Sequence, residues 1–179
     1  GTIYLLGGLH SPADERPANV FWKLDLTVPA KDRGWVALKT WPGAPRMLAV
    51  AGVINQTICL FSGTDLLKNE DGTLRRHYLN DGFAYNLQKG QWKKTAALPK
   101  PAVAAPTPAI TTKDSLLVIS GDHGELASQT EILKDDHPGF PATVIAYNLE
   151  GNFWSRANDF PKQTGDDPAG NPHAGIWPP

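Results

Sequence analysis

The chain has 179 residues, of which 41% are hydrophobic and 20% charged, with a formal net charge of -1. This length suffices for one domain with a sizeable core. The balance of 17 basic and 18 acidic residues gives no electrostatic reason to expect nucleic acid or an anionic membrane as a partner. No apolar run approaches the roughly 20 residues that a membrane-spanning helix needs.

Three short apolar runs each end in a small residue followed by glycine, and each begins a similar unit. The interval from Gly8 to Gly63 is 55 residues, and the interval from Gly63 to Gly121 is 58. A polar loop of variable length follows each glycine, and a second apolar run follows the loop. The paired runs are 3–8 and 20–26, then 58–63 and 82–87, then 116–121 and 143–149.

Each unit continues with a turn and a run that contains a tryptophan and ends at a proline. The tryptophans are Trp35, Trp92 and Trp154, and the prolines are Pro42, Pro99 and Pro161. Runs 47–55 and 109–114 precede the second and third glycine runs, whereas the first unit has no such run. The runs are rich in β-branched and aromatic residues and too short for helices, so they predict 3 + 4 + 4 = 11 strands. One short helix is expected within 129–137.

Four strands per unit, with a glycine pair and a later tryptophan, resemble the kelch repeat, which forms one blade of a β-propeller. The resemblance implies an all-β fold, a kelch-type β-propeller of three blades in which the first lacks its innermost strand. The tryptophan is expected to fill the wedge between blades. The expected blades span about 1–46, 47–104 and 105–162, in a single partial domain of residues 1–179 that ends in a linker, 163–179.

Three blades do not close a ring, because propellers have roughly four to eight. An open stack also leaves an exposed sheet edge. We therefore expect part of a six-bladed propeller, completed by remaining blades or by a second copy of the chain.

The long loops and the proline turns leave the same face of such a propeller, because successive strands of a blade are antiparallel. The turn 41–46 is expected to hold Arg46 at the mouth of the central channel. The alternative is that Arg46 ties neighbouring blades together through backbone carbonyls. Asp122 and His123 directly follow a strand glycine, and His10 has the equivalent place in the first unit. A structural hydrogen-bonding role is the alternative for all three.

Patterns for other chemistry are missing from the sequence. There is no HxxxH, no cysteine pair, no EF-hand loop and no phosphate loop, so we expect neither a metal nor a cofactor. The single cysteine, Cys59, lies in an apolar run and is expected to be a buried thiol.

The runs FWKLDL (21–26) and KDRGWVALKTWPGAPR (31–46) resemble the bacterial N-acetylneuraminate epimerase family, the sialic-acid mutarotases, in its circularly permuted branch. The resemblance implies a six-bladed, cofactor-free propeller that interconverts the anomers of sialic acid or a related sugar, in the periplasm or outside the cell. A base takes the anomeric hydroxyl proton, an acid protonates the ring oxygen, and a cation holds the carboxylate.

The resemblance assigns the carboxylate-binding position to Arg46, and we group His10 and Arg16 with it as substrate-binding residues. Asp122 and His123 are the catalytic candidates. The family's acidic residue belongs to a later blade and has no counterpart here, so we expect only part of the site in this chain. The alternative function is a non-catalytic kelch module whose long loops bind a protein or a glycan.

Overall fold

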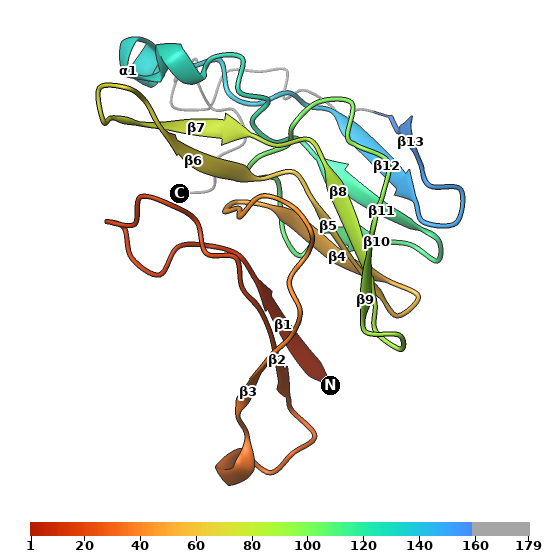
Figure 1. Ribbon diagram of the computed structural model, residues 1–179. Helices are drawn as coiled ribbons and strands as arrows, with labels where there is room; N and C mark the ends of the chain where they lie inside the picture. Colours follow the sequence, from red (N-terminus) through yellow and green to blue (C-terminus); the bar gives the residue numbers. More distant parts are fainter. Residues whose placement is uncertain (159–179) are drawn as a thin grey trace, which may run out of the picture.

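Three antiparallel sheets follow one another along the chain in the computed structural model, which describes residues 1–158 (Figure 1). Neighbouring strands in each of these sheets follow one another along the chain, except that the separate hairpin β6–β7 lies between β5 and β8. The first sheet holds β1 (Thr2–Leu6), β2 (Phe21–Asp25) and β3 (Trp35–Ala37). The second holds β4 (Val50–Ile54), β5 (Thr57–Phe61), β8 (Gly82–Asn86) and β9 (Gln91–Lys94). The third holds β10 (Ile110–Thr111), β11 (Ser115–Ile119), β12 (Val144–Asn148) and β13 (Phe153–Arg156).

These are the eleven strands that the sequence predicts, and the first sheet lacks an inner strand beside β1. The short helix is also present, as the α-helical turn α1 (Thr130–Leu133) between two 3-10 turns, η2 (Ala127–Gln129) and η3 (Lys134–Asp136). A further 3-10 turn, η1 (Ala30–Asp32), lies between β2 and β3. The proposed linker 163–179 and the end of the third blade lie outside the described residues.

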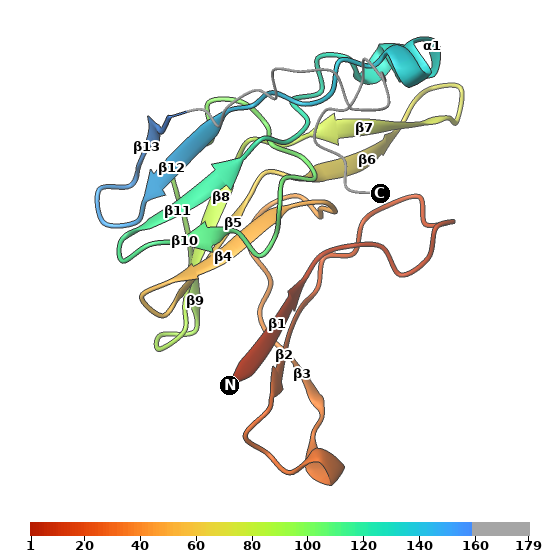
Figure 2. The same ribbon diagram turned by 180° about the vertical axis from the view of Figure 1, so that it is seen from behind.

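The segment 64–81, expected to be a loop, instead forms a hairpin of β6 (Thr64–Lys68) and β7 (Leu74–Tyr78). Its turn is fixed by Asp71, whose carboxylate accepts hydrogen bonds from the backbone N–H and the hydroxyl of Thr73. The hairpin is hard to predict from the sequence because β7 contains two arginines and mostly exposed side chains, without the apolar alternation that identifies a strand. Figure 2 shows the hairpin and α1 at the same end of the sheets.

The small residue and the glycine that follow the second strand of a unit adopt left-handed backbone conformations. Ser62 and Ser120 have φ of 56° and 60°, and the glycines that follow, Gly63 and Gly121, have φ of 91° and 107°. A Cβ on Gly63 would lie 2.8 Å from the Met47 carbonyl oxygen, and one on Gly121 would lie 2.9 Å from Ala102. Glycine therefore allows both the left-handed turn and the close approach of the next inner strand.

The tryptophans of the second and third sheets fill equivalent places against the preceding sheet. The indole Nε1 of Trp92 donates to the Lys39 carbonyl oxygen at 2.8 Å, and that of Trp154 donates to the Ala96 carbonyl oxygen at 3.1 Å. Each ring also lies close to a tyrosine of its own sheet and a phenylalanine of the preceding one. The pairs are Tyr85–Trp92, Phe21–Trp92, Tyr147–Trp154 and Phe61–Trp154, with centroids 4.8–5.3 Å apart.

Trp35 has the same position in the first sheet, yet 46% of its surface is exposed. It pairs across the ladder with Leu24, in the way that Trp92 pairs with Tyr85. Leu24 in turn lies opposite Ile3, which is also exposed. The tryptophan-bearing face of the first sheet is therefore uncovered by the described residues.

We predict that Trp92→Ala destabilises the protein by about 3–5 kcal/mol, because it empties a packed space between two sheets. Trp35→Ala serves as the matched control in the isolated chain, since half of that side chain is already in water. Urea denaturation followed by far-UV circular dichroism measures both. Equal losses for the two variants would contradict the difference in packing.

Candidate functional site

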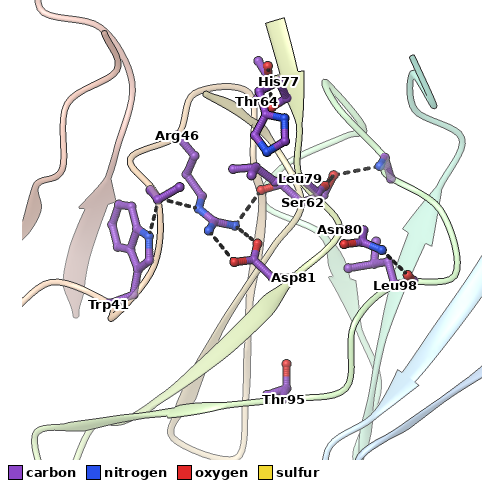
Figure 3. Close-up of polar contacts among 12 residues, drawn as sticks. Trp41, Arg46, Ser62, Thr64, His77, Leu79, Asn80, Asp81, Thr95 and Leu98 are labelled. Carbon is purple, nitrogen blue, oxygen red and sulfur yellow. Dashed lines mark hydrogen bonds and ion pairs between the residues drawn. The ribbon is translucent and has the colours of Figure 1, made fainter. Parts of the chain in front are cut away.

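Arg46 is buried and forms a bidentate ion pair with Asp81 (Figure 3). The guanidinium Nη1 lies 2.8 Å from Asp81 Oδ1, and Nη2 lies 3.1 Å from Oδ2. Nη1 also donates to the Ser62 carbonyl oxygen at 2.9 Å, and Nε donates to that of Ala44 at 3.3 Å. This ion pair joins the turn after the first sheet, which carries Arg46, to Asp81 directly before β8 of the second sheet.

Two aromatic rings complete the surroundings of this guanidinium. Its carbon lies 5.7 Å from the ring centroid of Trp41 and 5.3 Å from that of Phe83. Trp41 is itself fixed, because its indole N–H donates to the Ala44 carbonyl oxygen at 2.9 Å. The Arg46 side chain has no exposed surface, so a substrate carboxylate would reach it only by displacing Asp81. Its assignment to substrate binding stays a prediction, whereas its contacts are those of a residue that ties two sheets together.

The first loop carries the other two residues predicted to bind substrate. His10 and Arg16 are both exposed. The loop is braced by Asp14, whose Oδ2 accepts hydrogen bonds from the backbone N–H groups of His10 and Ser11. His10 and Arg16 are thus accessible to a ligand, and their role stays a prediction.

Asp122 lies at the end of the third sheet's second strand, where it also pairs with the turn before that sheet. Its backbone forms an antiparallel bridge with Val103. Its Oδ2 accepts the hydroxyl of Tyr78 at 2.6 Å, and its Oδ1 accepts the backbone N–H of Gly124 at 2.7 Å. Burial and this carboxylate raise the pKa of Tyr78, so the phenol remains the donor at neutral pH. Asp122 is therefore a carboxylate held in place by two donors.

His123 is half-buried beside Asp122 and next to a cation. Burial and the neighbouring Lys100 ammonium lower the pKa of His123 below its ordinary value of 6.5. Lys100 forms a 2.6 Å ion pair with Glu125. His123 is consequently neutral at pH 7 and has a nitrogen that can accept a proton.

The predicted residues fall at two successive sheet junctions. Arg46 lies between the first and second sheets, and its carbonyl oxygen accepts the N–H of Gly8, two residues before His10. Asp122 and His123 lie between the second and third sheets. The hairpin β6–β7 contacts both loops, through the Lys68–Glu15 ion pair at 2.9 Å and through Tyr78.

Sequence reasoning missed Asp81 and Tyr78, the two partners that define these contacts. Both lie in the segment taken for a loop. The sequence signal that identifies Asp81 is its position directly before Gly82, the first residue of β8. Nothing in the sequence pattern distinguishes Tyr78 from its neighbours on the hairpin.

Residues 1–158 offer neither a metal centre nor a membrane-spanning helix. In this part of the chain no three His, Cys, Asp or Glu side chains gather as a metal ion would require. No helix within it is long and apolar enough to cross a membrane. Cys59 is buried and free, and burial raises the pKa of its thiol to about 12.

The chain has an all-β fold whose antiparallel sheets match those of a β-propeller. A solved structure described as "Structure of YjhT" superimposes with a TM-score of 0.61 at 20% identity, over 87% of this chain and 51% of that one. At this identity the likeness shows the fold alone. No protein-family model matches the chain.

In sequence, the chain resembles proteins named N-acetylneuraminate epimerase. It is 34% identical over 93 residues to the one from Haemophilus influenzae (strain PittEE), which covers 52% of this chain and 21% of the relative. The one from Shigella sonnei (strain Ss046) is 35% identical over 78 residues, which is 44% of this chain and 20% of the relative. The one from Escherichia coli (strain K12) is 35% identical over 74 residues. The match thus spans about a fifth of each relative.

We predict that Arg46→Ala lowers the free energy of unfolding by about 3–5 kcal/mol, because it leaves the Asp81 carboxylate without its partner beside a buried surface. Arg75→Ala, on the exposed side of the hairpin, is the control and is expected to change stability little. Urea denaturation measures both. An Arg46→Ala protein that keeps its stability but loses sugar binding would instead make Arg46 a ligand of the substrate.

We predict that the NMR titration midpoint of His123 lies below 6.5 and moves towards 6.5 in Lys100→Gln, because the variant removes the second cause of the shift. Between the folded and unfolded pKa values the unfolded chain binds more protons, so stability falls as the pH falls below about 6.5. His123→Gln removes that part of the pH dependence. A midpoint above 6.5 would contradict the described surroundings.

Proposed function

We propose that the chain is part of a sialic-acid mutarotase-like propeller, which interconverts sugar anomers by acid and base catalysis of ring opening. The observation that carries the proposal is the partial identity to proteins named N-acetylneuraminate epimerase, on a chain with the propeller fold. The face formed by the long loops and the proline turns, here called the loop face, carries residues suited to this chemistry. His123 is neutral near pH 7 and can take the anomeric hydroxyl proton.

In this proposal Asp122 acts beside His123 as a fixed carboxylate. Both of its oxygens already accept hydrogen bonds, from Tyr78 and Gly124, so its position is set before substrate arrives. The exposed His10 and Arg16 contact the sugar from the first loop. Arg46 supports this face through Asp81, and the remaining part of the site belongs to other blades.

The tryptophan-bearing face of the first sheet is where another blade packs in this proposal. The second and third sheets each cover the corresponding face with a preceding sheet, which supplies a carbonyl acceptor for the indole N–H. On the first sheet the side chains of Ile3, Leu5 and Trp35 are exposed, and the other blade would cover them. The covering blade comes from remaining blades of the protein or from a second copy of the chain.

A non-catalytic kelch module that binds a protein or a glycan is the second candidate. It is favoured by the pairing of Arg46 with Asp81, which leaves the predicted arginine closed to a substrate carboxylate. In this function the long loops recognise the partner without chemistry.

We predict that the protein with its complete set of blades accelerates the α-to-β conversion of free N-acetylneuraminate, followed by NMR. His123→Gln is expected to lower the rate at least tenfold, because one proton-transfer group contributes roughly 10²–10⁴-fold. His77→Gln, an exposed histidine of the hairpin, is the matched control.

Sedimentation velocity first establishes whether the blades come from one chain or from two. A complete assembly that leaves the rate of anomer exchange at its value in buffer would exclude the mutarotase and leave the binding module. An unaltered rate in His123→Gln would remove this residue from the chemistry.

A further inference from the structure

The proposed reaction needs a cation beside the proton-accepting group. In a sialic acid the carboxylate is attached to the anomeric carbon itself, and an arginine fork binds a carboxylate best because it donates two parallel hydrogen bonds. Arg46 is closed to this role, because its side chain has no exposed surface and its fork is occupied by Asp81. Lys100 is occupied as well, by Glu125 at 2.6 Å.

Arg76 lies on β7, on the same face of the hairpin as Tyr78. Side chains two residues apart on a strand point to the same side, and their Cα atoms are roughly 7 Å apart. The ring of Tyr78 packs over Gly124, and its hydroxyl donates to Asp122 Oδ2 at 2.6 Å. The face that carries Arg76 is therefore the one beside the third loop, at the end of the sheets where Figure 2 shows the hairpin and α1.

The guanidinium of Arg76 lies near the hydroxyl of Tyr78. Burial and the Asp122 carboxylate raise the pKa of this phenol, and Arg76 partly offsets the rise through its own contact with the hydroxyl. The phenol thus connects the guanidinium with the carboxylate that directly precedes His123 in the chain. A cation, a fixed carboxylate and a neutral imidazole are consequently brought together beside the third loop.

Arg76 is exposed, and no acidic side chain neutralises it. None of the ion pairs among residues 1–158 includes this arginine. Its cross-strand partner is Leu66, which carries no charge. The positive charge of Arg76 is therefore available to an anion from solution, whereas those of Arg46 and Lys100 are not.

We propose that Arg76 is the residue that binds the carboxylate of the substrate, in the role that the sequence resemblance gives to Arg46. This inference rests on the proposed function for the identity of the substrate, and it adds the residue that selects an acid over a neutral sugar. Arg46 keeps the structural role of joining the first two sheets.

The test compares the binding of N-acetylneuraminate with that of its methyl ester, in which the same sugar carries no charge. Isothermal titration calorimetry measures both affinities on the protein with its complete set of blades. The unaltered protein is expected to bind the acid at least tenfold more tightly than the ester, and Arg76→Gln to bind both equally. Arg76→Lys keeps the charge without the fork and is expected to retain part of the preference.

Arg75→Gln is the matched control, because it removes the same charge from the adjacent residue, which points to the other side of the hairpin. It is expected to keep the full preference for the acid. Both positions are exposed, so thermal unfolding followed by circular dichroism is expected to show that both variants fold. Equal losses of preference in the two variants would indicate a general attraction to the charged hairpin and would contradict a specific role for Arg76.

The proposal is wrong if neither probe binds, if the unaltered protein binds the acid and the ester equally, or if Arg76→Gln keeps the preference. A preference that is lost in Arg16→Gln instead would assign the carboxylate to the first loop. Anomer exchange is measured separately on the same variants. A preference that depends on Arg76 in a protein without exchange activity would support this inference and exclude the mutarotase. Exchange activity with a full preference in Arg76→Gln would do the reverse.

Discussion

The fold depends on the packing of each tryptophan-bearing sheet face against the sheet before it. Twisted sheets that fan around an axis leave a wedge between them, and only large flat side chains fill it well. Trp92 and Trp154 do this with a tyrosine from their own sheet and a phenylalanine from the preceding sheet. Because the first sheet has no such neighbour in the described residues, Trp35 on its face is exposed to solvent.

The two junctions fill the inner part of the wedge in different ways. At the first, the buried guanidinium of Arg46 pairs with the partly exposed carboxylate of Asp81 and lies against aromatic rings, and it also donates to two carbonyl oxygens. A buried pair of this kind is tolerated only when its hydrogen bonds are satisfied. At the second, Ala102 and Thr143 stand in the same places, and a cleft of about 400 Å³ lies beside them. One scaffold thus gives a closed junction and an open one.

The sequence predicts the blade strands well because three independent signals coincide in each unit. Glycine after a small residue, an acid or amide at the end of the third strand and a tryptophan on the fourth each have a local cause. In the structure Asp25, Asn86 and Asn148 all accept backbone N–H groups of the turn that follows. Such causes act within a few residues and can be recognised in a single sequence.

The parts that sequence reasoning missed depend on contacts between units. The hairpin β6–β7 has a charged outer strand, and Asp81 is 35 residues from Arg46. Arg46 lies in the proline-containing turn between sheets, and its predicted place at a channel mouth stays a prediction. Nothing local in the sequence shows that the carboxylate of Asp81 pairs with it. The candidate site was therefore predictable as a set of loops and not as a set of partners.

The hairpin is anchored more firmly to the third sheet than to the first, and this decides which part of the loop face is preorganised. Its ion pair with Glu15 is exposed at both ends, and such pairs contribute little. The hydrogen bond from Tyr78 to Asp122 is part-buried and charge-assisted, and the Tyr78 ring packs closely over Gly124. A Cβ on Gly124 would lie 2.8 Å from that ring, so glycine is required there. The residues beside His123 and the cleft are accordingly held in place before any ligand binds, whereas the first loop, with His10 and Arg16, depends on its own turn.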